Sequence, residues 1–281
     1  MILYLSGTGN TRWVAESIAR MTGDERVVDI ASVCSQPLHV QLNPGESLGI
    51  FFPVHGWRPP MLLRRVLSEM TLSVGSECNV KPYVYSVCTV GDTVGESMDI
   101  LRSDLKKQGV SLDAVFDVRM PNTYVGLPFM DVDKEKVVSD KLHEAQPRME
   151  FIAEKIRERA NGAFMRYLGR WKRINSRLLG EAFVRKLVTD RYFHVEESLC
   201  VSCGKCVASC PVGNMSLDDD GMPQWNHDGS CLTCFACYHN CPRHAIRSGS
   251  VTDKKGQYVF DPKRAQNAKN QANGISILYL M

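Results

Sequence analysis

The chain has no apolar run near the roughly 18 residues that a membrane-spanning helix needs. Charge of one sign is also scarce: 34 Lys and Arg against 31 Asp and Glu leave +3 at pH 7, too little to favour nucleic acid. No basic leader precedes the first apolar residues, so we expect a cytoplasmic protein whose thiols stay reduced. The 281 residues, 44% of them hydrophobic, indicate a globular protein of about two domains.

Cysteine, by contrast, is abundant in one place. Eight of the eleven cysteines form two copies of the pattern Cys-x2-Cys-x2-Cys-x3-Cys-Pro. The first copy consists of Cys200, Cys203, Cys206, Cys210 and Pro211, and the second of Cys231, Cys234, Cys237, Cys241 and Pro242. A tight loop can bring three thiolates at this spacing around a cubane cluster. Zinc sites usually use cysteine pairs, and disulfide frameworks belong to small secreted chains, so iron–sulfur chemistry is favoured.

This segment resembles bacterial two-cluster ferredoxins. The resemblance implies two [4Fe–4S] clusters, with the fourth cysteine of each run binding the cluster of the other run. One cluster would be held by Cys200, Cys203, Cys206 and Cys241, and the other by Cys231, Cys234, Cys237 and Cys210. We therefore expect a small α+β ferredoxin domain over residues 194–249 that carries electrons.

The first 125 residues alternate strand and helix patterns. Strands are expected at 2–5, 26–30, 48–54, 82–88 and 114–120. Continuous apolar strands between helices favour an α/β domain with a doubly wound, five-stranded parallel sheet over residues 1–160. Such sheets bind ligands outside the carboxyl ends of their strands.

A hydroxyl-rich loop follows the first strand, with the sequence Ser6-Gly7-Thr8-Gly9-Asn10-Thr11. It leads into a helix whose N-terminal amides and dipole can bind a phosphate. A Walker loop would need a lysine, and a dinucleotide fingerprint would need a third glycine where Arg12 stands. The terminal phosphomonoester of FMN suits this loop better.

Two further loops are expected at the same edge of the sheet. They are Pro53-Val54-His55-Gly56-Trp57 after the third strand and Cys88-Thr89-Val90-Gly91-Asp92 after the fourth. Trp57 can stack on a flavin or simply pack in the core, and His55 can equally be an exposed loop residue. Together the three loops resemble those of flavodoxin-like domains, which implies FMN binding.

The whole chain resembles flavodoxin–ferredoxin fusion proteins of anaerobes. The Pro-Val-x-Gly loop, the segment Met120-Pro121-Asn122-x-Tyr124 and the two cysteine runs carry this resemblance. It implies FMN, two [4Fe–4S] clusters and electron transfer with a redox protein such as a ferredoxin, a reductase or an acceptor enzyme. His55 departs from it, because such loops often carry an aromatic residue there.

Two alternatives remain open at this stage. FMN could directly reduce a small substrate, with His55, Cys88, Asp92 and Tyr124 as candidate proton donors, although they form no recognisable catalytic set. The chain could also be an iron–sulfur scaffold with a vestigial flavin site, but the intact phosphate loop weighs against this.

The rest of the chain is less informative. An apolar stripe predicts a helix around 133–160, broken or kinked at Pro147. Residues 161–193 are strongly basic and are expected to be a helical linker between the domains; contact with a membrane surface or a partner is the alternative. Residues 250–281 form a tail whose apolar end, 275–281, could dock on a neighbouring surface. Outside the two runs stand Cys34, Cys78 and Cys88, which we expect to be small buried hydrophobes, with Cys88 alone near the flavin.

Overall fold

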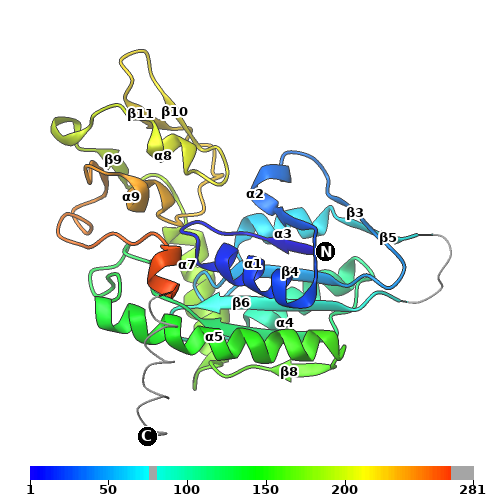
Figure 1. The fold of residues 1–281 in the computed structure, drawn as a ribbon. Helices are drawn as coiled ribbons and strands as arrows, with labels where there is room; N and C mark the ends of the chain where they lie inside the picture. The colour runs from blue at the N-terminus through cyan, green and yellow to red at the C-terminus, as the bar shows by residue number, and fades with distance from the viewer. Residues whose placement is uncertain (76–80, 267–281) are drawn as a thin grey trace, which may run out of the picture.

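The computed structural model describes residues 1–75 and 81–266 (Figure 1). Cys78 and the apolar end at 275–281 lie outside these residues. A large α/β region occupies the N-terminal part of the chain, and a small cysteine-rich region, drawn in yellow and orange, packs at one end of it (Figure 1).

The α/β region is built on a parallel sheet with the strand order β2-β1-β4-β6-β7-β8. Its strands are β1 (Ile2–Tyr4), β2 (Val27–Asp29), β4 (Leu48–Pro53), β6 (Val84–Val90), β7 (Ala114–Arg119) and β8 (Gly162–Phe164). The five expected strands all form, and their order in the sheet is 2-1-3-4-5. The expectation of a five-stranded sheet is corrected to six, because β8 pairs with β7 over three residues. A strand this short carries no periodicity that a sequence pattern could reveal. A separate parallel pair joins β3 (His39–Leu42) and β5 (Thr71–Val74).

Helices cover both faces of the sheet. One apolar core lies under α1 (Asn10–Thr22) and α5 (Glu135–Arg157). The opposite core lies under α2 (Ile30–Val33), α3 (Met61–Ser68) and α4 (Ser97–Lys107). Strands buried on both faces explain the continuous apolar runs in the sequence. Helix α5 continues past Pro147 as one element, so this proline does not end the helix.

A buried ion pair attaches the end of the α/β region to its sheet. Arg148 on α5 contacts Asp117 on β7 at 3.0 Å, and their side chains are only 5% and 0% exposed. The other carboxylate oxygen of Asp117 accepts the backbone N–H groups of Arg166 and Tyr167, each at 2.8 Å. Arg148 also donates to the carbonyl of Phe164. These contacts hold β8 and the start of the basic segment in place.

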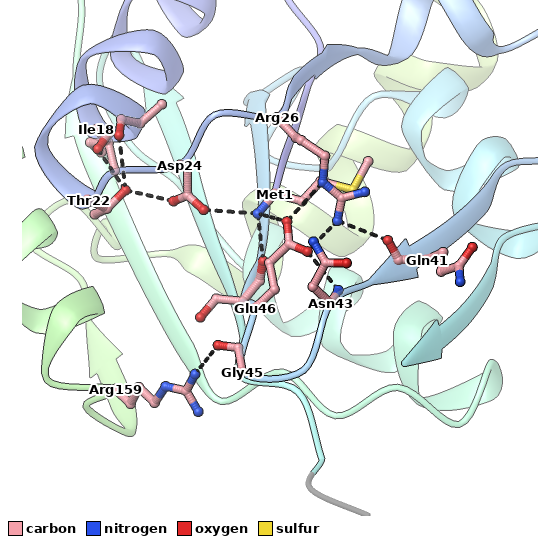
Figure 2. Close-up of polar contacts among 12 residues, drawn as sticks. Met1, Ile18, Thr22, Asp24, Arg26, Gln41, Asn43, Gly45, Glu46 and Arg159 are labelled. Carbon is pink, nitrogen blue, oxygen red and sulfur yellow. Dashed lines mark hydrogen bonds and ion pairs between the residues drawn. The ribbon is translucent and has the colours of Figure 1, made fainter. Parts of the chain in front are cut away.

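A second polar network lies at the amino ends of the strands (Figure 2). The N-terminal ammonium contacts Asp24 at 2.9 Å and Glu46 at 3.0 Å, and Arg26 pairs with Glu46. Burial opposes the charged form of Glu46, but its hydrogen bonds to Arg26, to the Asn43 N–H and to the ammonium lower its pKa to about 2. This network is far from the loops that follow the strands.

The cysteine-rich region consists of short elements. Its strands are β9 (Phe193–Val195), β10 (Met215–Leu217), β11 (Pro223–Trp225) and β12 (Ile246–Ser248), and its helical elements are a 3-10 turn (Glu197–Leu199), α8 (Lys205–Ala208) and α9 (Ala236–Asn240). Two antiparallel pairs, β9 with β12 and β10 with β11, enclose a small core around Phe235 and Tyr238.

The basic segment before the cysteine-rich region packs against loops of the α/β region. It contains α6 (Lys172–Ile174), a π-helical turn (Asn175–Leu179) and α7 (Gly180–Leu187). Ser176 joins two loops, since its hydroxyl donates to the Trp57 carbonyl at 3.1 Å and accepts the Glu96 N–H at 2.7 Å. Within residues 1–75 and 81–266, no helix combines the length and apolar character that crossing a membrane requires.

Candidate functional site

The eight cysteines of the two runs line two small cavities. One cavity, which we call the outer set, is lined by Cys200, Cys203, Cys206 and Cys241. The other, the inner set, is lined by Cys210, Cys231, Cys234 and Cys237. The fourth cysteine of each run therefore faces the first three of the other run, in the same grouping that the ferredoxin resemblance implied.

Backbone geometry in the two runs is matched. The N–H two residues after the first cysteine points to its sulfur, from Ser202 to Cys200 at 3.5 Å and from Thr233 to Cys231 at 3.4 Å. The N–H four residues after the last cysteine does the same, from Asn214 to Cys210 and from Ala245 to Cys241, each at 3.2 Å. Such N–H···S contacts stabilise thiolate charge and tune a cluster.

The four cysteine sulfurs of each set are arranged as ligands of a cluster and not of a single metal ion. In the part of the chain that the structure describes, no three His, Cys, Asp or Glu side chains converge on one metal-ion position. In a [4Fe–4S] cluster each iron takes its own thiolate, so four sulfurs spaced around a cavity are the appropriate arrangement.

The two sets differ in exposure. Cys203 of the outer set is exposed to solvent. In the inner set, burial raises the pKa of Cys234 to about 12 and the pKa of Cys237 well above its ordinary value. The difference in exposure is therefore confined to Cys203, since Cys206 and Cys241 of the outer set are buried and all four cysteines of the inner set are partly buried.

A cleft of about 240 Å³ lies at the carboxyl ends of β1, β4, β6 and β7. Every FMN-site residue predicted from the sequence lines it, except Gly9 and Cys88. Gly9, with φ of 95°, is the N-cap of α1 and faces Phe260 instead, since a Cβ there would lie 2.9 Å from that of Phe260. Cys88 is fully buried in the core, because β6 extends to Val90 and the loop begins two residues later than expected.

The Ser6–Thr11 loop is tied to its neighbours by side chains. The hydroxyl of Thr11 lies 2.7 Å from that of Thr89, which joins the first and third predicted loops. Asn10 donates its amide to the Pro121 carbonyl at 3.0 Å and accepts the Tyr258 hydroxyl at 2.9 Å. The side chain of Asn10 is thus occupied by protein, which leaves the hydroxyls and the first-turn amides of α1 for an anion.

The loop after β4 presents an aromatic ring. His55 and Arg58 exchange backbone hydrogen bonds at 3.0 and 3.1 Å, and Gly56 and Trp57 between them have φ of 54° and 59°. Positive φ at both central residues gives a tight turn that is uncommon for tryptophan. Its indole N–H donates to the Thr93 hydroxyl at 2.9 Å, which fixes the ring at the cleft. Burial lowers the pKa of His55 to about 4, so this imidazole is neutral at pH 7.

Several cleft residues were not predicted. They are Thr93, Thr123, Leu127, Met130, Phe183, Leu232, Thr233 and Cys234. Phe183 comes from α7 and meets Tyr124 edge-to-face at 5.3 Å. The last three belong to the cysteine-rich region. No local sequence signal could have placed them here, because they reach the cleft only through long-range packing.

Cys234 belongs to both sites, since it lines the cleft and the inner cysteine cavity. It packs against the predicted phosphate loop: a Cβ built on Gly7 would lie 3.2 Å from the Cys234 Cβ and 3.4 Å from its Sγ. Leu232 and Thr233 are shared in the same way. The cleft and the inner set are therefore separated by a single wall.

A segment near the C-terminus, residues 255–260, connects the two regions. Lys255 donates its ammonium to the carbonyls of Val125 at 3.0 Å and Met130 at 2.6 Å, beside the cleft. Gln257 donates to the Cys241 carbonyl at 2.8 Å. The Phe260 N–H donates to the Thr8 carbonyl at 2.9 Å. The segment thus holds the cysteine-rich region against the cleft loops.

His239, on α9, completes this connection. Its Nε2 donates to the Thr123 carbonyl at 2.7 Å, and its Nδ1 accepts the Tyr258 N–H at 3.2 Å. Burial lowers the pKa of His239 to about 4, in keeping with the neutral tautomer that these two contacts require.

Comparison with known proteins bears on the cysteine-rich region. Residues 193–242 match the 4Fe-4S dicluster domain family. The chain is 36% identical over 73 residues to a ferredoxin of Pyrobaculum islandicum, an alignment that covers 24% of this chain and 65% of that ferredoxin. These matches support iron–sulfur clusters and electron transfer in this region, and a ferredoxin-type domain implies a redox partner.

Among solved structures, the chain is similar to the metal-soaked Flv1 flavodiiron core of Synechocystis sp. PCC6803. The match has 17% identity and a TM-score of 0.27 and covers 55% of this chain and 36% of that chain. A likeness this weak carries no argument about the α/β region.

Proposed function

We propose that the chain is an electron-transfer protein in which FMN in the cleft exchanges electrons with two [4Fe–4S] clusters, and through them with a redox protein. The observation that carries this proposal is Cys234, a predicted cluster ligand that also forms a wall of the cleft. A cofactor in the cleft and a cluster on the inner set would be neighbours inside one chain.

The cleft has features that suit FMN. It opens at the carboxyl ends of parallel strands with the order 2-1-3-4-5, which is typical of flavodoxin-like domains. Among the residues that the structure describes, neither lysine nor arginine lines the cleft, so the hydroxyls of Ser6 and Thr8 and the amides at the start of α1 would hold the phosphate. Trp57 and Tyr124 offer aromatic surface to the ring. FMN supplies a centre that accepts one or two electrons, whereas each cluster passes one at a time.

The alternative, direct reduction of a small substrate by FMN, has less support. Cys88 does not line the cleft, His55 is neutral at pH 7, and burial raises the pKa of Tyr124 to about 12. Phe183 and residues 232–234 also cover part of the cleft. Both features favour an electron carrier over an enzyme with an open substrate site.

The proposal is tested by cofactor analysis of protein purified without oxygen. We expect about eight iron, eight sulfide and one FMN per chain, since two four-iron clusters and one flavin site are proposed. Thr11→Glu places a carboxylate in the phosphate loop and should remove FMN while both clusters persist. Thr71→Glu, at an exposed position on β5, is the matched control and should keep FMN. Wild-type protein without flavin, or Thr11→Glu protein with normal FMN affinity, would refute the flavin site.

A further inference from the structure

We propose that the two cysteine sets have different roles. The inner set passes electrons to and from the cleft, and the outer set is the site at which an external one-electron redox protein docks and exchanges electrons. This inference rests on the proposed function and assigns an order to it. The path runs from the partner to the outer set, from there to the inner set, and then to the flavin, and it can run in reverse.

The inner set is the one in contact with the cleft. Cys234 packs against Gly7 of the phosphate loop, and Leu232 and Thr233 continue the same wall. No cysteine of the outer set lines the cleft. Electron transfer falls steeply with distance, so a cofactor in the cleft would exchange electrons with the inner cluster first.

Hydrogen bonds hold the inner set against the cleft. Thr233 accepts the backbone N–H of Thr189 at 2.8 Å, which anchors the inner run to the end of the basic segment. His239 follows Cys237 by two residues and bonds to Thr123, next to Tyr124 of the cleft. The inner set is therefore fixed against the cleft on two sides, as a relay requires.

The outer set faces solvent. Cys203 is exposed, and the two apolar side chains at its rim, Val201 and Leu217, are 58% and 42% exposed. Asp219 and Asp220, two and three residues after Leu217, are exposed. An apolar rim beside a solvent-facing cluster is the arrangement expected of a surface where redox proteins meet transiently.

Charge indicates the kind of partner. Residues 194–249 contain six acidic residues and three basic ones, Lys205, Arg243 and Arg247, before the negative charge of the thiolate-bound clusters is counted. A negative surface attracts a partner that presents basic groups around its redox centre. We therefore expect a one-electron redox protein with a basic docking face.

The electron count balances along this path. With clusters and FMN bound, each passage would move one electron from the reduced partner through the outer and inner sets to the cleft. Two passages would complete the reduction of the flavin, with the accompanying protons taken from water. The partner is oxidised by one electron in each passage.

The experiment compares Cys203→Ala with Cys234→Ala in otherwise intact chains. Iron counts and EPR spectra establish which cluster remains, and FMN content is measured in each variant. After a light pulse reduces the clusters, Cys234→Ala should reduce FMN internally at least about tenfold more slowly than wild type. Asp219→Lys, at an exposed position two residues after Leu217, keeps every cysteine and should match the wild-type internal rate. With an oxidised c-type cytochrome that carries lysines around its haem edge as the external partner, Asp219→Lys should instead lose several-fold in the second-order rate at which the partner oxidises the reduced clusters.

A variant that keeps all the ligands guards against misfolding. Gly7→Ala inserts a methyl group 3.2 Å from the Cys234 Cβ and should slow internal transfer several-fold in molecules that retain FMN. Gly75→Ala, where the nearest atom is 3.5 Å away, should leave the rate unchanged. As a readout that needs no turnover, FMN added to flavin-free protein should alter the EPR signal that Cys234→Ala removes, and leave unaltered the signal that Cys203→Ala removes.

The outcomes separate this inference from the function on which it rests. If wild-type clusters do not reduce FMN internally, the proposed function fails. If they do, but Cys234→Ala leaves the internal step unchanged, the function stands and the assigned order is wrong. An unchanged reaction of Asp219→Lys with the cytochrome would show that the outer set is not the docking site of the external partner.

Discussion

The α/β region and the cysteine-rich region are stabilised in different ways. The sheet of the α/β region is buried between two large apolar cores. The cysteine-rich region has strands of three residues, helices of four and five residues, and one small core that includes Cys206 and Cys241 themselves. A region this small cannot bury enough apolar surface to be stable alone, so its fold should depend on bound clusters, whereas the α/β fold should not.

Loss of iron should therefore have the largest effect, and only in one region. Chelation under oxidising conditions should unfold residues 193–249, because cluster ligation supplies much of their folding free energy. Hydrogen exchange should show lost protection there and retained protection in β4 and β6. Equal protection of both regions before and after iron removal would contradict the comparison.

Breaking the buried Arg148–Asp117 pair should destabilise the α/β region and leave the cysteine-rich region intact. Arg148→Met leaves the Asp117 carboxylate buried without its cation, which should cost the α/β region about 3–5 kcal/mol. Denaturant unfolding measures this loss, and the iron content of the folded protein should stay constant. Arg102→Met, which removes an exposed pair with Asp99, should cost no more than about 1 kcal/mol. Equal losses of unfolding free energy in the two variants would show that burial does not determine how much an ion pair stabilises this protein.

The contact between the two regions should contribute less to the free energy of unfolding than the interior of either region. His239→Ala removes a partly buried hydrogen bond to Thr123 and a buried one from Tyr258, and should cost about 1–3 kcal/mol. Hydrogen exchange should rise in residues 120–130 and 255–260. His244→Ala, also in the cysteine-rich region but without these bonds, is the control. If exchange rises no more in His239→Ala than in this control, His239 does not join the regions.

The smallest expected effect is a pH dependence confined to the α/β region. Glu46 has a pKa of about 2 in the folded protein, below its ordinary value of 4.5. Its ionised form therefore stabilises the fold above about pH 5, and this contribution is lost as the pH falls toward 2. Allowing for screening by solvent, we expect about 1 kcal/mol, measured as the difference in acid unfolding between wild type and Glu46→Gln. Identical acid profiles would show that Glu46 contributes nothing.

The comparison also explains what the sequence could predict. The cysteine cavities are built within one short stretch, so the spacing of the runs could be recognised in the sequence, and the resemblance to two-cluster ferredoxins implied that Cys210 groups with Cys231 and Cys241 with Cys200. The core strands of the sheet were predictable because each is a continuous apolar run. Strand β8 was missed because three residues, held by Arg148, carry no periodicity.

The cleft was only half predictable. Its loops follow strands and could be recognised, but Phe183, Leu232 and Thr233 arrive from more than 120 residues away in sequence from the Trp57 loop. The same holds for Asn10, whose partner Tyr258 is 248 positions away. Cys88 was misplaced by the end of one strand, since a shift of two residues moves a side chain from the loop into the core.

The central claim is that the two regions exchange electrons within one chain, and rapid mixing tests it most directly. An anaerobic one-electron reductant should bleach the cluster absorbance first, and FMN should then be reduced at a rate independent of protein concentration, because the cleft and the inner set share a wall within one chain. Separating the chain at Asn161 should make that second phase slower and dependent on concentration. Second-order reduction of FMN in the intact chain would contradict the account, since it would mean that the regions do not communicate internally.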